Sequence, residues 1–256
     1  MSLITTQMQD SVLTIRFNRA EKKNALTQVM YGELADHCKR AAADSAIRAV
    51  LIGGTADCFS AGNDMVDFLK GQGEFKDTET ARFMNAMYDL HKPVIAAVNG
   101  LAIGIGTTLL LHCDFVYAAA AARFTMPFVN IGICPEFGSS YLIPALIGQR
   151  RAAELLLLGE SFSAEKAREY GIVNEVLPDA AQCEAHALEV ARRAAAQPPQ
   201  SMRTAKKLMR QALDATVRAA HDREIAALTP SIKGPEAREA MTAFMQKRKP
   251  DFSSFV

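Results

Sequence analysis

The sequence predicts an α/β fold whose first half alternates strands with helices and whose second half is mainly helical. Apolar, strand-like runs alternate with segments of helical periodicity up to about residue 124, and helical patterns dominate beyond it. Alternation of this kind favours layers of sheet and helix. The chain has 256 residues, of which 49% are hydrophobic. This is enough for one large domain with a sizeable core.

The first predicted strand and helix lie before residue 45. Residues 12–17 alternate apolar and polar side chains, which is typical of a half-buried strand. Thr27 can cap a helix that ends near residue 43. Four residues are expected along one side of that helix: Val29, Met30, Leu34 and Cys38.

Two further strands and one helix complete the first half. Residues 49–54 and 94–98 are short apolar runs that predict strands. Between them, residues 78–90 place Ala81, Met84 and Tyr88 at helical spacing.

The second half is predicted as a series of helices with one short strand. The helices cover residues 150–159, 163–170, 179–196, 201–227 and 234–247, and the strand covers 172–177. The segment QPPQ, residues 197–200, interrupts the helical pattern. We therefore expect a core over residues 1–197 and a helical region over 198–256.

Composition excludes several classes of protein. The formal net charge is +1, which argues against a dedicated nucleic-acid binder. A secretory signal and a membrane-spanning segment are not expected, because glycines and Asn99 interrupt the longest apolar stretch. The five cysteines are scattered without a CxxC pair, so neither a metal site nor a disulfide framework is expected. Reduced thiols predict a cytoplasmic location.

Two glycine-bearing turns about forty residues apart are the most informative motifs. They are residues 58–65 (CFSAGNDM) and 99–106 (NGLAIGIG), and each follows a predicted strand. Glycine lets the backbone turn sharply, so two such turns could aim two N–H donors at one developing oxyanion. Ordinary strand-to-helix connections are the alternative. A dinucleotide fingerprint is excluded because Leu109 stands where the third glycine is required.

Several motifs in a fixed order resemble those of the crotonase, or enoyl-CoA hydratase/isomerase, superfamily. Besides the two turns, they are RAEKKNAL at 19–26, Cys113-Asp114, PEFGSS at 135–140 and FMQKRKP at 244–250. The resemblance covers nearly the whole chain. It implies a crotonase-like spiral of ββα repeats with a C-terminal helical region that drives trimer formation. A homotrimer or a dimer of trimers is therefore expected.

The resemblance also implies an oxyanion hole and a catalytic base. The two donors would be the N–H groups of Asn63 and Ile105, where most relatives have glycine at the second position. The positions of the two hydratase glutamates carry Thr108 and Phe128 here. A single glutamate, Glu136, stands in a context similar to that of peroxisomal-type Δ3,Δ2-enoyl-CoA isomerases. The alternative for Glu136 is a solvated glutamate that caps a helix beginning near Gly138.

The substrate implied by the resemblance is an acyl-CoA thioester, with no cofactor beyond the coenzyme A it carries. The nucleotide would lie near Lys22, Asn24 and Ala25. The adenine and its phosphate would lie near Phe244 and Lys247 of the same or a neighbouring subunit. The thioester and pantetheine would lie near Ala61, Asp64, Met65 and Gly104. The acyl chain would meet Phe68, Phe83, Met84, Met87, Phe128 and Ile131.

Three functions follow, and they belong to different classes. The first is an isomerase that shifts a 3-enoyl-CoA double bond to the 2-position. The second is an enoyl-CoA hydratase or another crotonase-type reaction, against which the absence of both hydratase carboxylates argues. The third is a CoA-ester-binding protein with little catalysis, for which a buried base at Glu136 would serve no purpose.

Overall fold

The strands within the described residues form two sheets. The computed structural model describes residues 2–55, 57–70 and 74–255. In this part of the chain, the larger sheet has the order β1-β2-β3-β5-β7-β10 and the smaller one β4-β6-β8-β9. The strands of the large sheet are β1 (Ile4–Gln9), β2 (Val12–Phe17), β3 (Ala49–Gly53), β5 (Val94–Val98), β7 (Phe115–Ala119) and β10 (Glu175–Leu177). Those of the small sheet are β4 (Cys58–Ser60), β6 (Leu101–Ile103), β8 (Arg123–Thr125) and β9 (Phe162–Ser163).

The helices surround these sheets. The longer ones are α1 (Gln28–Ala43), α3 (Glu79–Tyr88), α5 (Ser139–Ile147), α6 (Gln149–Leu157), α8 (Ala180–Ala195), α9 (Pro199–Lys233) and α10 (Pro235–Met245). The shorter ones are α2 (Met65–Lys70), α4 (Ile105–Thr108), α7 (Ala164–Glu169) and the 3-10 turns η1 (Ala20–Lys22), η2 (Phe75–Asp77), η3 (Leu109–His112) and η4 (Val129–Ile131). Thr27 and Thr78 cap α1 and α3 with their side chains. The cap of α1 was predicted.

Successive strand pairs divide between the two sheets, which produces a spiral of ββα units. β3 joins the large sheet and β4 the small one, and helices α2 and α3 follow. The pair β5 and β6 repeats this before α4, and β7 and β8 repeat it before η4. The pairings β3–β5–β7 and β4–β6–β8 are parallel. The expected crotonase-like spiral is therefore confirmed, and it places the ends of β4 and β6 next to each other.

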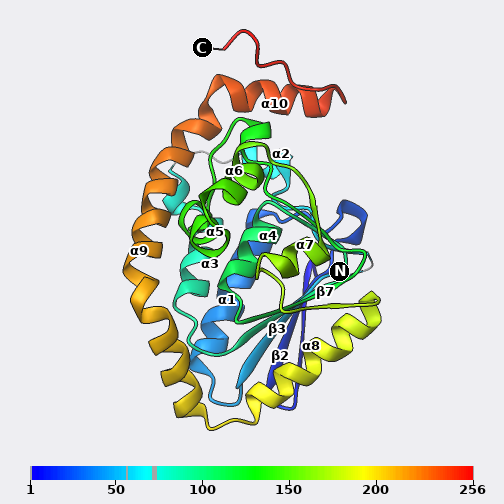
Figure 1. Ribbon diagram of the computed structural model, residues 1–256, viewed down its shortest axis with the longest axis vertical. Helices are drawn as coiled ribbons and strands as arrows, with labels where there is room; N and C mark the ends of the chain where they lie inside the picture. Colours follow the sequence, from blue (N-terminus) through cyan, green and yellow to red (C-terminus); the bar gives the residue numbers. More distant parts are fainter. Residues whose placement is uncertain (1, 56, 71–73, 256) are drawn as a thin grey trace.

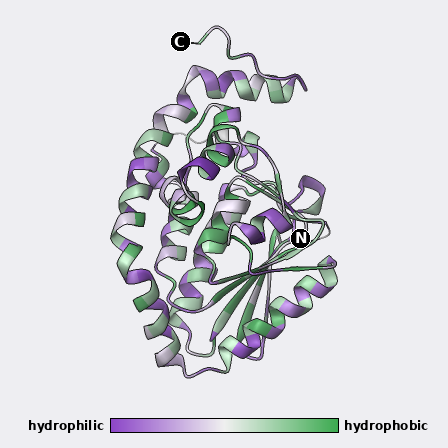
Figure 2. Cartoon of the chain, in the orientation of Figure 1, coloured by the Kyte–Doolittle hydropathy of each residue, from purple (hydrophilic) through white to green (hydrophobic). Residues whose placement is uncertain are grey.

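The central strands of the large sheet, β3, β5 and β7, are buried on both faces. Along β3, Val50 and Ile52 pack into the main core with α1 and α3, whereas Leu51 packs into a second cluster with Ala187 and Ala191 of α8. Strands buried on both faces are expected to be almost continuously apolar, and Figure 2 shows this along the sheet. The sheet and its helices form the rigid frame on which the site is built.

Two predictions about the elements were wrong, and six strands were not predicted: β1, β4, β6, β7, β8 and β9. β1 was not expected, because it is exposed at every residue after Ile4 and so shows no core pattern. Val29 is 65% exposed, although Met30, Leu34 and Cys38 are buried as expected. The helix predicted to end near residue 227 continues to Lys233, through Pro230.

The C-terminal helices form a separate layer. Figure 1 shows α9 running along one side of the molecule and α10 crossing its end, after the break that follows α8. α9 packs on α5 and η2, and α10 packs on η4. No helix within the described residues is long and apolar enough to cross a membrane. The division into a core and an oligomerisation region stays a prediction.

Candidate active site

The two glycine-bearing turns meet at the ends of β4 and β6. Gly62 has φ +86°, and a Cβ on it would lie 2.8 Å from the carbonyl oxygen of Ile103. A Cβ on Gly106 would lie 2.8 Å from the carbonyl oxygen of Ser60. Both positions need glycine because the two backbones approach too closely for a side chain.

The backbone N–H of Asn63 faces away from the strand-like segment beside it. Leu26 and Asn63 form a parallel bridge, in which the Leu26 N–H donates to Gly62 O and the Asp64 N–H donates to Leu26 O, each at 2.8 Å. In a parallel pairing, the residue between two such bonds turns its own N–H to the opposite side. The Asn63 N–H therefore points away from Leu26.

The backbone N–H of Ile105 lies at the beginning of α4. Gly104 precedes it with φ +55°, and its carbonyl oxygen accepts the N–H groups of Thr107 and Thr108. The first N–H of a helix has no intrahelical acceptor, so that of Ile105 remains a donor for other groups. The helix α4 begins at Ile105 itself. It is four residues long, so the donor acts locally and owes little to a helix dipole.

Glu136 is a buried carboxylate with one oxygen bonded and one left over. It is 5% exposed, and its Oε1 accepts a hydrogen bond from the hydroxyl of Thr108. Its Oε2 is buried without a hydrogen-bond partner among the described residues. Burial raises the pKa of Glu136 to about 8; the Thr108 bond opposes this rise and the charge of Glu224 adds to it. Glu136 is therefore a proton acceptor with a pKa of about 8.

The alternative for Glu136, a solvated glutamate capping a helix, is wrong. Its side chain is buried, and the helix in question, α5, takes its cap from Glu224 on α9. Oε2 of Glu224 accepts from the Gly138 N–H at 2.5 Å, and Oε1 accepts from the Ser140 N–H at 2.8 Å.

The residue after Glu136 is held by a histidine. Phe137 has φ +60°, which is unusual for an aromatic residue. Its ring stacks on His112 with centroids 3.9 Å apart, and its carbonyl oxygen lies 2.7 Å from His112 Nε2. Burial lowers the pKa of His112 to about 3, so the ring is neutral. A neutral ring donates to this carbonyl only when its proton is on Nε2.

Residues 7–254 match the sequence model of the family described as enoyl-CoA hydratase/isomerase. The chain belongs to this family. It is therefore an acyl-CoA enzyme of the hydratase/isomerase type, within the crotonase superfamily.

Relatives of this family at similar identity carry different reaction names. The 2,3-dehydroadipyl-CoA hydratase of Escherichia coli (strain K12) is 33% identical over 98% of this chain and 99% of its own length. Enoyl-CoA delta isomerase 2 of Rattus norvegicus is 34% identical over 96% of this chain and 64% of its own length. A crystal structure of an enoyl-CoA hydratase/isomerase from Pseudoalteromonas atlantica T6c has a TM-score of 0.93 and 37% identity, covering 98% of this chain and all of that one. Identity alone does not separate hydratase from isomerase.

One residue near the site was missed in the sequence, and the role of another was misread. Thr108 was interpreted only as a missing carboxylate, yet it donates to Glu136. Tyr31 of α1 is fully buried, and its hydroxyl lies 2.5 Å from Asn63 Oδ1. Burial and then the charge of Glu136 raise the pKa of Tyr31, so the phenol is neutral and close to both functional residues. Neither role leaves a local pattern, since each depends on a contact between distant segments.

Most of the residues expected near coenzyme A are exposed or partly exposed, whereas Asn24 and Asp64 serve the protein itself. Lys22 is exposed on η1, and Ala25, Ala61, Met65 and Gly104 are partly exposed, so all five can contact a ligand. Phe244 is 63% exposed and Lys247 is exposed at the end of α10.

Asn24 and Asp64 differ from this expectation. Asn24 is fully buried; its Oδ1 accepts from the Arg19 N–H at 2.9 Å and its Nδ2 donates to Cys58 O at 2.8 Å. The expected contact with the nucleotide is therefore corrected to a role in holding the first turn. Asp64 pairs with Arg19 at 2.7 Å and accepts the N–H groups of Val66 and Asp67, so its carboxylate organises the start of α2.

The described residues expected around the acyl chain are buried or partly buried. Phe128 is 4% exposed and Ile131 is partly exposed, both in or beside η4. Phe83, Met84 and Met87 belong to the main core, and the ring of Phe83 lies 6.3 Å from that of Phe137. The side chain of Phe68 lies outside the described residues. Among the described residues, no group of three His, Cys, Asp or Glu is placed to hold a metal ion.

Proposed function

We propose that this protein is a Δ3,Δ2-enoyl-CoA isomerase that uses Glu136 as its single base. Glu136 removes a proton from C2 of a 3-enoyl-CoA, and the electron pair moves into the thioester carbonyl to give a dienolate. The same carboxyl group returns the proton to C4, and the double bond comes to lie between C2 and C3. The enzyme is regenerated without a water molecule or a cofactor entering the balance.

The observation that carries this proposal is the state of the Glu136 carboxylate. One oxygen is oriented by Thr108 and the other has no hydrogen-bond partner among the described residues. A base must have a free oxygen, and it works best when its pKa lies near the working pH. Burial brings the pKa of Glu136 to about 8, which suits a group that both takes and returns a proton.

The two glycine-bearing turns support the second half of the proposal. The N–H groups of Asn63 and Ile105 belong to turns that touch, and neither is engaged by the bridge or helix beside it. Donors aimed at a thioester oxygen stabilise the charge that develops as the dienolate forms. Since the backbone supplies both donors, the isoleucine at position 105 is compatible with this role.

A hydratase is the second candidate, favoured by the 33% identity to a named hydratase. A hydratase must activate water and protonate carbon, for which a second carboxylate is usual. Thr108 and Phe128 occupy the two positions at which the resemblance places the hydratase glutamates. The other buried carboxylate of the site, Glu224, has both oxygens bonded to backbone N–H groups. Its oxygens are not available to hold a water.

Paired assays on 3-hexenoyl-CoA and crotonyl-CoA test the proposal. Wild type should isomerise the first with negligible hydration of the second, and Glu136→Gln should lower isomerisation by about 10²- to 10⁴-fold. Glu160→Gln, on the surface, is the matched control and should keep wild-type rates. Hydration of crotonyl-CoA that survives Glu136→Gln would refute the single-base isomerase. Tight binding of both thioesters without turnover would favour a binding protein instead.

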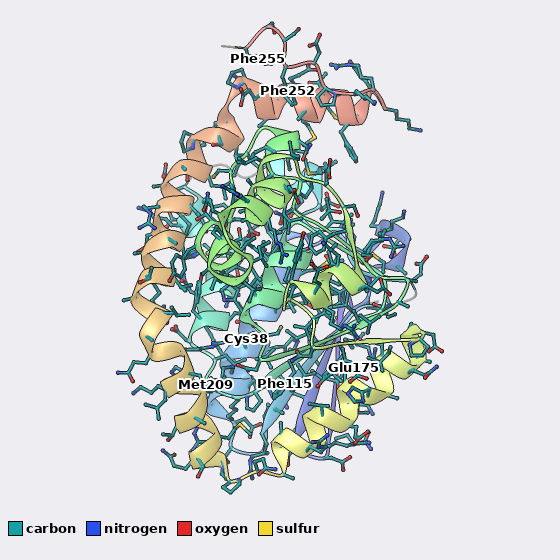
Figure 3. The ribbon with its side chains drawn as sticks, viewed as in Figure 1. Cys38, Phe115, Glu175, Met209, Phe252 and Phe255 are labelled. Atoms are coloured by element: carbon teal, nitrogen blue, oxygen red, sulfur yellow. The ribbon has the colours of Figure 1, made fainter. Side chains whose placement is uncertain are left out.

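We also propose that the chain assembles as a homotrimer or a dimer of trimers. Met209 of α9, labelled in Figure 3, is 79% exposed, and Leu213 of the same helix is 44% exposed. Both line a hollow together with Leu111 and Leu142. Exposed apolar side chains around a hollow are typical of surfaces that a partner covers. Light scattering of the purified protein should give three or six chain masses, and a monomer would contradict the proposal.

A further inference from the structure

Helix α5, which follows Glu136 directly, has no cap of its own. Its N-cap residue is Gly138, which has no side chain to accept the first N–H groups of the helix. Glu224 of α9, 86 residues further along the chain, accepts the N–H groups of Gly138 and Ser140 instead. A cap brought from another helix ties the position of α5 to that of α9.

The same residue also contacts the other end of the loop that carries Glu136. The thiol of Cys134 lies 3.7 Å from the backbone carbonyl oxygen of Glu224. Between these two contacts, Phe137 and Gly138 have φ +60° and +74°. A left-handed conformation is costly for a phenylalanine, so it persists only where the surroundings hold it. Glu224 on one side and His112 on the other supply that restraint.

Glu224 is, besides, a negative charge buried close to the base. It is 5% exposed, and both of its oxygens accept N–H donors, which favours the ionised carboxylate. Burial raises the pKa of Glu224, and the hydrogen bonds from Ser140 and Gly138 oppose that rise. Its charge raises the pKa of Glu136 in addition to the effect of burial.

The other titratable groups around Glu136 are neutral. Burial and neighbouring carboxylates raise the pKa of Tyr31, Tyr88 and Cys134. Burial lowers the pKa of His112 and His221. Among the described residues, Glu224 is therefore the charged side chain that acts on Glu136.

We propose that Glu224 is a positioning residue that fixes the loop of the catalytic base and places a second carboxylate beside it. The inference rests on the proposed function only in treating Glu136 as the base. It explains why a carboxylate is placed on α9 beneath a helix whose N-cap is glycine. A neutral acceptor would complete the cap but would leave the proton affinity of Glu136 lower.

Glu224→Gln and Glu224→Asp separate the two effects. The protonation of Glu136 is followed by pH-difference infrared spectroscopy, subtracting Glu136→Gln in each background, and kcat and KM are measured in parallel. Glu224→Gln should move the titration midpoint of Glu136 to lower pH by about one unit. Glu224→Asp keeps the charge but shortens the clamp, so kcat should fall about tenfold while the midpoint stays within about 0.3 unit of wild type. KM should change less than kcat in both variants.

Asp179→Asn is the matched control, because Asp179 caps α8 with a carboxylate at the Gln182 N–H, far along the chain from Glu136. It should lower stability without moving the midpoint or kcat. An unmoved midpoint in Glu224→Gln, or wild-type kcat in Glu224→Asp, would overturn the proposal. If Glu224→Gln does not fold, a shifted midpoint in Glu224→Asp overturns it and an unshifted one with lowered kcat supports it. The infrared titration reads Glu136 directly, so it holds even if the isomerase assay fails.

Discussion

The two halves of the proposed site are built in opposite ways. The proposed oxyanion half consists of backbone from two turns, each of which follows a short strand of the small sheet, β4 or β6. The base half consists of side chains, and Glu136 depends on Thr108, 28 residues away, and on the Glu224 clamp from α9. A backbone-built site tolerates new side chains except where glycine is needed. A site built from side chains depends instead on the residues that hold those side chains, even when they lie far along the chain.

Gly62→Ala should produce the largest effect on the oxyanion half. The new Cβ would lie 2.8 Å from Ile103 O on a residue with φ +86°, so the two turns must separate. Misplacing one oxyanion donor should lower kcat by about 10²- to 10³-fold. Steady-state kinetics with 3-hexenoyl-CoA measure this.

Gly148→Ala is its matched control. Gly148 has φ +82°, but a Cβ there meets nothing within 4 Å. It imposes similar backbone strain far from both turns, so stability should fall while kcat stays near wild type. Equal losses of kcat in the two variants would mean that strain, and not the contact between the turns, limits activity.

The burial of Glu136 should make the protein less stable as the pH rises. The pKa of Glu136 is about 8 in the folded protein against an ordinary 4.5, so the folded state keeps its proton to higher pH than the unfolded state. Between these values the unfolded state releases the proton first, and stability falls with increasing pH. Each unit of pKa difference is worth about 1.4 kcal/mol, so the loss relative to Glu136→Gln can reach a few kcal/mol.

Urea unfolding of wild type and Glu136→Gln between pH 4.5 and 8.5 checks this. The difference in unfolding free energy should favour the glutamine variant increasingly with pH. A constant difference would mean that Glu136 is ionised throughout and that its environment is more polar than its burial indicates.

The sequence alone predicted the two turns that meet in the structure, but it did not predict the contacts of the side-chain half. Glycines after strand-like runs predict turns at a sheet edge, and the structure brings residues 58–65 and 99–106 together there. Caps such as Thr27 are equally local, since the hydroxyl reaches an N–H three residues away. What failed depends on contacts between distant segments, as for Tyr31, Thr108 and Glu224. Local periodicity carries no information about which of α9's residues faces the loop at 134–140.

Thr108→Val sharpens the comparison on the base half. Valine keeps the shape but removes the hydroxyl that donates to Glu136 Oε1. Losing a donor to the ionised form should raise the pKa of Glu136 further. The acidic limb of the pH–rate profile should move to higher pH, with about tenfold lower activity at pH 7 and a smaller loss above pH 9.

Thr107→Val provides the neighbouring control. Its hydroxyl donates to Ala102 O at 2.6 Å and does not bond to Glu136. Stability should fall by about 1 kcal/mol while the pH–rate profile keeps its position. A limb that moves equally in both variants would assign the shift to a general loosening of α4.

Tyr31→Phe should give the smallest effect, because it removes a single side-chain contact to the backbone half. Its hydroxyl bonds to Asn63 Oδ1, while the Leu26 bridge already sets the direction of the Asn63 N–H. A single hydrogen bond is worth about 1 kcal/mol net, so kcat should fall only about two- to fivefold with an unchanged pH–rate profile. Tyr117→Phe, on the opposite face of the large sheet, should not change kcat. A loss above a hundredfold would give Tyr31 a direct part in the chemistry, and the oxyanion half would then depend on a side chain as the base half does.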